Sequence, residues 1–420
     1  MQRFLVLQAA RFGDLVQTKR LVSSLEQQGE VSLLVDRGLA PLAHLIYPRV
    51  QILSAVFHGT LEREECALNE KTFALLAGSR YDTVFNCNFS GLTSAICRLF
   101  ASEQVVGWRP KRFFSGADTF SSLERSPLLA LVSRMTTRRN IACLNLEDVW
   151  AHFLPDPLAP STVNPLPEAG GRGVGVVLAG REMRRSLPPP LLADLISIYA
   201  HLYPDRPIYF FGTEREKSSG YLVRRSLPPV LNTRVQDLCA KTDWAGLIDA
   251  LRGLDVLLSP DTGTMHLAAH LGVPVRAFFL SSALCHETGP YGAGHRVWQA
   301  APLCAPCLEK AACTNDMACC KVLMGRNFLR AVTRQEQGLS CEAPQDVQCF
   351  AGDFDELGLV MKCCAGLDPQ EEDRRALRRL LTQILCLGCA RDTPSASERR
   401  LLETLLLQDT DFMLPTSRYR

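Results

Sequence analysis

The sequence predicts an α/β protein of two doubly wound domains followed by a cysteine-containing extension. Its 420 residues are enough for two or three domains with separate cores. Short β-rich runs alternate with segments of helical periodicity in both halves of the chain, and a proline-rich stretch separates the two series. We therefore expect an N-terminal domain over 1–160, a second domain over 172–320 and an extension over 321–420.

The first series begins with a short apolar strand and a helix over 15–28, whose apolar residues recur at helical spacing. A strand–helix–strand order of this kind favours a parallel sheet. The strands expected in this domain are residues 4–7, 31–35, 51–53, 83–86 and 105–107.

Residues 155–171 contain five prolines and end in Ala–Gly–Gly, a composition typical of an interdomain linker. A second alternating series follows it. Ligands of doubly wound sheets bind beyond the carboxyl ends of the strands, so we expect the site in a cleft between the two domains. The strands expected in the second domain are residues 174–178, 208–211, 235–238, 256–258 and 275–280, with helices over 191–203, over 244–251 and from 264.

Composition and charge restrict the partners and the cellular location. A formal net charge of +2 gives no global attraction to nucleic acid. The basic cluster Arg134, Arg138 and Arg139 either meets an anionic acceptor or forms a solvated helix face. The apolar run at 4–7 is too short for a signal peptide, and no run of about eighteen apolar residues occurs. We expect a cytoplasmic protein with at most peripheral contact to the inner face of the membrane.

The most informative segment is LLSPDTGTMHLAAHLGVPVRAFFL, residues 257–280. It predicts a buried strand, a turn and then a helix that starts near Thr264, whose first amides can bind a phosphate. Gly263 allows close approach of a ligand to the backbone. Asp261 and Thr262 offer hydrogen bonds, and His266 lies on the first helical turn. The alternative is a helix-capping turn with His266 buried in the core.

The run DTGTMHLAAHLGVP, followed by HETGPYG, resembles the signature of the ADP-heptose:lipopolysaccharide heptosyltransferases, glycosyltransferase family 9. FLVLQAARFGDLVQTKRLVSSL is similar to the family's opening strand and Gly–Asp loop. VGVVLAGREMRRSLPPPLLADL, IYFFGTEREK and LCAKTDWAGLIDALRGLDVLLSPDTG fit later blocks, in order, up to about residue 320. The resemblance implies the GT-B fold, in which two Rossmann-like domains face each other across a cleft.

In this family the Gly–Asp loop carries the general base, a role that the resemblance places on Asp14, beside Gly13. An acceptor hydroxyl must lose its proton as it attacks the anomeric carbon, and a carboxylate can take that proton. A single in-line displacement inverts that carbon through a transition state with oxocarbenium character. The alternative for Asp14 is that it is the N-cap of the following helix, and one loop position is compatible with both roles.

The family pattern K-x-W-P corresponds here to Arg185–Ser186–Leu187–Pro188, so Arg185 stands where the phosphate-binding lysine is expected and Leu187 replaces the tryptophan. Arginine can bind phosphate bidentately and keeps its charge. Arg181 could add a second phosphate contact. The alternative is a solvated basic helix start.

Glu216 stands where the family has an acidic residue facing the ribose of the nucleotide. Glu214 is a close competitor, and an exposed charged loop is an equal alternative. Lys19 also departs from the family, which commonly has proline there, and this change affects the expected acceptor contacts.

Cys304, Cys307, Cys313 and Cys320 have the spacing of a metal-binding knuckle for structural zinc or an iron–sulfur cluster. Reduced thiols in a packed loop and a disulfide are the alternatives. Catalysis requires no cofactor under the family resemblance. After these cysteines, residues 368–387 and 395–407 have the pattern of helices with charged faces, whereas residues 327–364 show weak periodicity.

The function implied by the resemblance is an inverting, metal-independent transfer of heptose from ADP-heptose to a lipid-linked saccharide of the lipopolysaccharide core. A family member with another nucleotide sugar or acceptor is the nearest alternative. A nucleotide-sugar epimerase of the same fold is a rival from another class. A binding protein without activity is a third.

Overall fold

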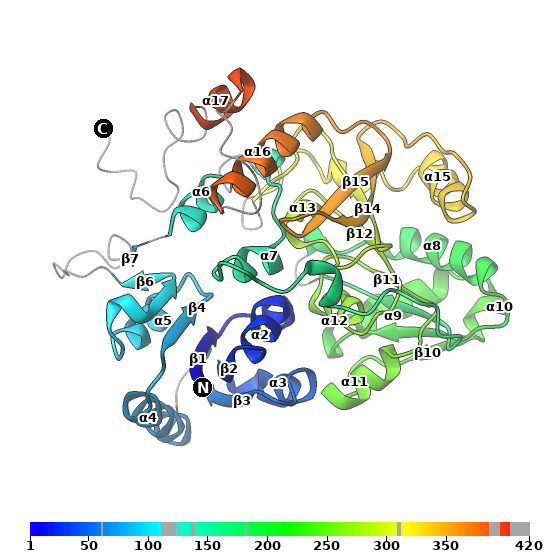
Figure 1. The fold of residues 1–420 in the computed structure, drawn as a ribbon. Coiled ribbons are helices and arrows are strands. Elements are labelled where there is room, and N and C mark those ends of the chain that lie inside the picture. Colours follow the sequence, from blue (N-terminus) through cyan, green and yellow to red (C-terminus); the bar gives the residue numbers. More distant parts are fainter. Residues whose placement is uncertain are drawn as a thin grey trace. The chain divides into compact units, whose positions relative to one another are not determined.

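The computed structural model describes residues 1–59, 62–110, 123–124, 126–135, 139–180, 183–308, 312–385 and 395–403. The chain divides into two compact units (Figure 1). Unit 1 consists of Met1–Ala142, Leu146–Val163 and Asp373–Arg420, and unit 2 of Cys143–Asn145 and Asn164–Glu372. Among the helices within these described ranges, none is long and apolar enough to cross a bilayer.

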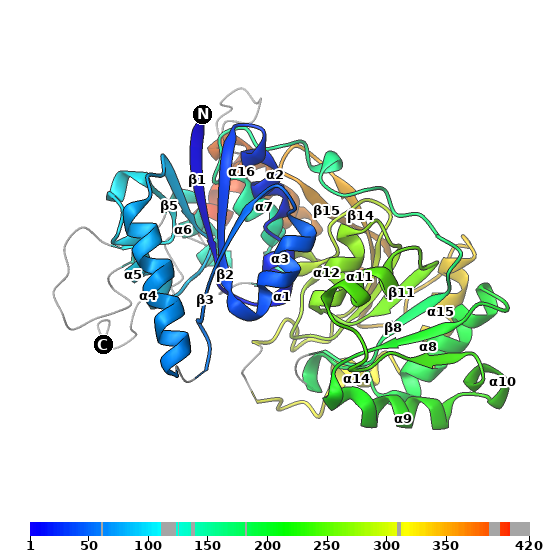
Figure 2. The same cartoon turned by 90° about the horizontal axis from the view of Figure 1, so that it is seen from below.

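Unit 1 contains a five-stranded parallel sheet in the order β3-β2-β1-β4-β5. The apolar runs predicted from the sequence form these strands, and Leu5 and Leu7 of the central strand are fully buried. Figure 2 shows α4 and α5 along one face of the sheet and α2, α3 and α7 along the other. The strands are β1 (Gln2–Gln8), β2 (Gly29–Asp36), β3 (Gln51–Ala55), β4 (Thr83–Asn86) and β5 (Val105–Gly107).

The helices of unit 1 are mostly short. They are α1 (Phe12–Val16), α2 (Lys19–Glu26), α3 (Ala40–Ile46), α4 (Arg63–Gly78), α5 (Gly91–Cys97), α6 (Pro127–Met135) and α7 (Leu146–Ala151), with 3-10 turns at Arg37–Leu39, Ser102–Gln104, Arg139–Ile141 and Pro160–Thr162. The predicted helix over 15–28 is interrupted, because Gln17 and Thr18 separate α1 from α2. A two-stranded ribbon pairs β6 (Arg109–Pro110) with β7 (Leu123–Glu124).

Unit 2 contains an eight-stranded sheet in the order β10-β9-β8-β11-β12-β13-β14-β15. Its first six strands in this order are parallel, and β14 and β15 are antiparallel additions. The strands are β8 (Val174–Val177), β9 (Ile208–Phe211), β10 (Val235–Asp237), β11 (Val256–Ser259), β12 (Val275–Phe279), β13 (Arg296–Ala300), β14 (Val347–Phe354) and β15 (Leu359–Ala365).

The helices of unit 2 connect these parallel strands and continue beyond them. They are α8 (Pro189–Leu202), α9 (Lys217–Ser226), α10 (Pro229–Asn232), α11 (Trp244–Leu251), α12 (Gly263–His270), α13 (Cys285–Thr288), α14 (Ala318–Lys321) and α15 (Arg326–Glu336), with 3-10 turns η5 at Met183–Arg185 and η6 at Glu214–Glu216. The predicted α/β fold of two doubly wound units is thereby confirmed.

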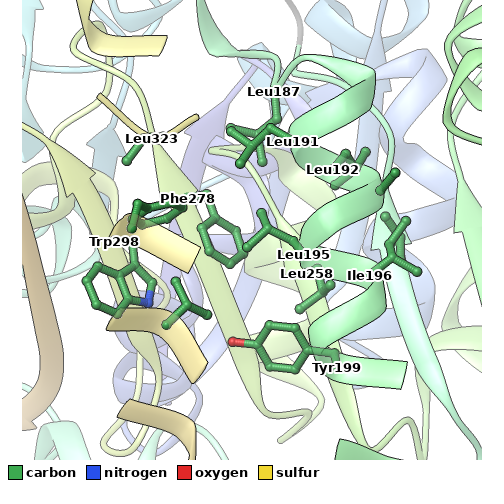
Figure 3. Packing of buried hydrophobic residues seen from close by; sticks show 14 of the residues in the cluster. Leu187, Leu191, Leu192, Leu195, Ile196, Tyr199, Leu258, Phe278, Trp298 and Leu323 are labelled. Carbon is green, nitrogen blue, oxygen red and sulfur yellow. The ribbon is translucent and has the colours of Figure 1, made fainter. Parts of the chain in front are cut away.

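A dense apolar core fixes α8 against the sheet of unit 2 (Figure 3). Leu195 and Phe278 are fully buried in it, and the ring of Trp298 meets that of Phe328 edge-on at 5.4 Å between centroids. Leu187, 3% exposed, anchors the chain just before α8. Because Leu187 follows Arg185 by two residues, this core also fixes the loop that carries Arg185.

The region expected as a single extension over 321–420 is divided between the two units. Strand β14 pairs with β13 and extends the sheet of unit 2, and Glu336 of α15 forms ion pairs with Arg276 (2.7 Å) and Arg296 (3.1 Å). From Asp373 onward, α16 (Glu371–Ile384) and α17 (Ala396–Glu403) group with unit 1. The sequence of 327–364 shows only weak periodicity, so strands β14 and β15 were not predicted. These two strands form an antiparallel hairpin at the end of the sheet.

Candidate functional site

The site in unit 2 lies where the strand order reverses, between β8 and β11. Both strands are parallel and adjacent, so the loops that follow them leave the same edge of the sheet. Ligands of doubly wound sheets bind at this topological switch point. The loops after β8 and β11 carry most of the residues predicted from the sequence.

The turn after β11 ends in a well-capped helix. Thr262 is the N-cap of the eight-residue helix α12, and its Oγ1 accepts a hydrogen bond from the amide of Met265 at 3.2 Å. Ser259 Oγ lies 3.0 Å from the same hydroxyl. The amides of Gly263 and Thr264 begin the helix, where backbone N–H groups favour an anion. The observed capping turn and the predicted phosphate-binding turn are therefore the same segment of the chain.

Arg185 and Asp261, from different loops, form an ion pair at this edge. Arg185 Nη1 lies 3.1 Å from Asp261 Oδ2, and the two side chains are 18% and 5% exposed. Thr288 Oγ1 donates to the same carboxylate oxygen at 3.4 Å, and His266 Nε2 lies 3.8 Å from Oδ1. The structure thus brings Arg185, Asp261 and His266 together, and adds Thr288, which the sequence analysis left unassigned.

His266 is buried in this cluster and is neutral at physiological pH. Burial lowers its pKa to about 3, and the positive charge of Arg185 acts in the same direction. His266 therefore adds an uncharged ring to the site, whereas the positive charge comes from Arg185.

The loop after β8 is shaped by Gly180. Its amide donates to Ser186 Oγ at 3.1 Å, and a Cβ placed on Gly180 would lie 2.6 Å from that of Arg185. Only glycine fits this close approach. Arg181, the predicted second phosphate ligand, lies outside the described residues.

Glu216 lies in η6, beyond the carboxyl end of β9. Its Oε2 accepts hydrogen bonds from the amide and the hydroxyl of Thr213, both at 2.6 Å, so the carboxylate caps its own turn. Glu214 instead pairs with Lys217 at 2.7 Å on the surface. A contact between Glu216 and a ribose remains a prediction. The carboxylate of Glu216 would have to bind the ribose while it also accepts the two hydrogen bonds from Thr213.

Asp14 of unit 1 lies next to Gly13 in α1, the first helix after β1. Its Oδ2 accepts a hydrogen bond from the amide of Arg11 at 3.1 Å, so Asp14 caps α1 from the third helical position, whereas the N-cap itself is Arg11 and not Asp14. This bond orients the carboxylate at the β1–β4 switch point of the unit 1 sheet. The capping role is compatible with the predicted role as a base.

Asn88 supports this loop and was missed in the sequence. Its Oδ1 accepts from the amide of Ala9 at 3.1 Å, and its Nδ2 donates to Leu7 O at 2.7 Å, so it joins the ends of β4 and β1. His58 Nε2 lies 3.1 Å from Ala9 O. The sequence contained a signal for Asn88, because this polar residue lies just after the strand predicted at 83–86, where ligand-binding loops of such sheets begin.

Lys19 begins α2 and is part of a buried charged cluster with α7. Burial lowers the pKa of Lys19 to about 8 against the opposing effect of Glu147, whose own pKa burial raises to about 8. Beside them, Arg20 and Asp148 form a buried ion pair at 2.6 Å. Lys19 thus interacts electrostatically with Glu147, an acidic residue of the same unit.

The predicted metal ligands differ in their surroundings. Cys304 and Cys313 are exposed, Cys307 is half-buried, and Cys320 packs in the hydrophobic core of unit 2. Within the part of the chain that the structure describes, no three His, Cys, Asp or Glu side chains are grouped to hold a metal ion. The metal-binding knuckle has no support in this arrangement and stays a prediction.

Two units, each with a doubly wound parallel sheet, are the architecture of the GT-B class of proteins. Residues 203–318 match the sequence model of glycosyltransferase family 9 (heptosyltransferase). This stretch contains the whole Asp261 turn and α12. The predicted resemblance is confirmed, and the chain is a glycosyltransferase.

Solved structures agree with this fold. The E. coli heptosyltransferase WaaC, solved with ADP, is 17% identical over 73% of this chain and 96% of its own length, with a TM-score of 0.54. The E. coli ADP-heptose lipopolysaccharide heptosyltransferase II is 13% identical over 80% of this chain and 100% of its own, with a TM-score of 0.49. No curated protein sequence matches the chain.

The depressed pKa of His266 predicts a specific pH dependence of stability. Below pH 6.5 the unfolded chain binds a proton at this position and the folded protein does not, so stability is lost as pH falls toward 3. His266→Gln should reduce the loss between pH 7 and pH 5 by about 2 kcal/mol, measured by urea denaturation. His201→Gln, which replaces an exposed histidine, should lose as much stability between pH 7 and pH 5 as the wild type does. An equal dependence of the unfolding free energy on pH in wild type and His266→Gln would refute this account.

Proposed function

We propose that this glycosyltransferase inverts the anomeric carbon as it transfers heptose from ADP-heptose to a lipid-linked saccharide of the lipopolysaccharide core, without a metal. The observation that carries this proposal is the Arg185–Asp261 pair beside the start of α12. The donor sugar follows from the family resemblance and from the relatives that are named for ADP-heptose.

The charge of the donor explains the composition of this cluster. A nucleoside diphosphate leaves with growing negative charge, which a fixed cation and helix-start amides can stabilise in place of a metal ion. Arg185 is held at the edge of the sheet and keeps its charge. The amides of Gly263 and Thr264 and the hydroxyl of Thr262 lie at the beginning of α12 on the same edge.

Asp261 prepares Arg185 for this role. In the absence of a nucleotide its carboxylate balances the guanidinium and keeps it oriented, at an N–O distance of 3.1 Å. A guanidinium carries five N–H donors in a planar fork, a geometry that can contact a carboxylate and a diphosphate together. We assign Arg181 to a second phosphate contact and Glu216 to the ribose, as the resemblance implies.

Asp14, beside Gly13, would take the proton from the attacking acceptor hydroxyl. The bond from the amide of Arg11 orients its carboxylate, and Asn88 fixes the preceding loop to the sheet. Attack and departure then occur in one displacement, which inverts the anomeric carbon.

A donor panel tests the substrate. The purified chain is incubated with a lipopolysaccharide-core acceptor and with ADP-heptose, ADP-glucose, UDP-glucose or GDP-mannose, and release of the nucleoside diphosphate is followed. We expect acceptor-dependent release of ADP from ADP-heptose, unchanged by EDTA. Release from a non-heptose donor alone would overturn the assigned sugar, and scrambled sugar stereochemistry without acceptor would indicate an epimerase.

Replacement of the proposed base separates chemistry from binding. Asp14→Asn should lower kcat by about a hundredfold or more, because general base catalysis contributes about 10²–10⁴-fold, and should leave ADP affinity unchanged. The exposed Asp156→Asn, in the same unit, is the matched control and should keep full turnover. Wild-type turnover in Asp14→Asn would exclude this residue as the base.

A further inference from the structure

Residues 304–308 lie against two strand-end loops of unit 2, the loop after β8, which carries Arg185, and the loop after β12. The amide of Cys307 donates to Ser281 O at 2.8 Å, just beyond the carboxyl end of β12. Arg184, in the loop after β8, donates from Nη2 to Cys307 Sγ at 2.6 Å and from Nη1 to Leu308 O at 3.2 Å. This cysteine segment is therefore joined to two strand-end loops at once.

Arg184 connects these contacts to the ion pair between Arg185 and Asp261. It directly precedes Arg185, so both belong to η5 (Met183–Arg185). Ser282 Oγ donates to Arg184 O at 3.1 Å, which fixes its backbone to the loop after β12. The position of the Arg185 guanidinium thus depends on a neighbour whose own side chain is held by the sulfur of Cys307.

Cys304 supplies a second thiol near this sulfur. The two cysteines form a Cys-x-x-Cys pair, a spacing at which a disulfide can close. Cys304 is exposed and reachable from solution, whereas Cys307 is half-buried against Arg184. The exposed thiol can react first with a small molecule, and the half-buried thiol can then resolve the product.

We propose that Cys304 and Cys307 are a thiol–disulfide modification site that controls nucleotide binding through Arg184. This inference rests on the proposed function, in which Arg185 binds the diphosphate of the donor. Arg184 is accordingly a positioning residue, and Cys307 holds it in the reduced protein.

The reaction needs a small-molecule disulfide such as oxidised glutathione as the oxidant. The Cys304 thiolate attacks one glutathione sulfur, forming a mixed disulfide and releasing one glutathione thiolate. The Cys307 thiolate then attacks Cys304 Sγ, forms the Cys304–Cys307 bond and releases the second glutathione. Two electrons pass from the protein thiols to the oxidant, and the two protons of these thiols go to the glutathione thiolates.

Closing this bond changes the support of Arg184. The sulfur that accepts the guanidinium hydrogen bond becomes half of a disulfide, a weaker acceptor that is redirected toward Cys304. Arg184 loses a charge-assisted contact, and its bond to Leu308 O is left to join η5 to residues 304–308. We expect the adjacent Arg185 to bind a diphosphate less well.

ADP titration by calorimetry on the full chain tests this inference. Affinity is measured after reduction, after treatment with oxidised glutathione and after renewed reduction with dithiothreitol, and peptide mass spectrometry identifies the disulfide. Oxidation should weaken ADP binding by roughly tenfold, the effect of one contact to a charged group, and reduction should restore it.

Two variants assign the effect to this pair. Cys304→Ser should bind ADP as the reduced wild type does and should lose the response to oxidised glutathione. Cys66→Ser, which removes an exposed thiol of α4, should keep the full response. A Cys304–Cys307 disulfide with unchanged ADP affinity, or a response that persists in Cys304→Ser, would overturn the inference alone. A reduced protein that does not bind ADP would refute the proposed function as well.

Discussion

The ion pair between Arg185 and Asp261 is the interaction on which the account of this protein depends. It joins the loop after β8 to the loop after β11 across the switch point of a doubly wound sheet. The two side chains are only 18% and 5% exposed, so the attraction between their charges is stronger than it would be in water, because the surrounding protein screens charge less than water does. The pair holds a permanent cation beside the start of α12, the arrangement on which the proposed diphosphate site rests.

Several features of the fold hold this pair in place. Leu187 and the core around Trp298 fix the chain after Arg185, and Gly180 provides the close approach before it. On the other side, Thr262 caps α12 and Thr288 donates to Asp261. Residues outside the ion pair thereby help to fix the position of the Arg185 guanidinium, and residues 304–308 contribute to the same support through Arg184.

The sequence predicted the parallel strands of the two large sheets with the exception of β13, because apolar runs that are buried on both faces of a sheet stand out from their surroundings. It also predicted that Arg185 and Asp261 serve one site, although their direct pairing required coordinates. The strands β14 and β15 were missed, since polar and apolar residues mix irregularly in that hairpin. Contacts such as Arg184 to Cys307 join residues 123 positions apart, and no local pattern reports them.

Calorimetric titration of the reduced protein with ADP, comparing wild type with Arg185→Gln, tests the central claim most directly. Arg225→Gln, which removes a cation stacked on Tyr221 in the same unit, controls for the loss of charge. If Arg185 binds the diphosphate, ADP affinity should fall by about tenfold or more in Arg185→Gln and stay unchanged in Arg225→Gln. Equal affinity in wild type and Arg185→Gln would place the diphosphate elsewhere and contradict the account.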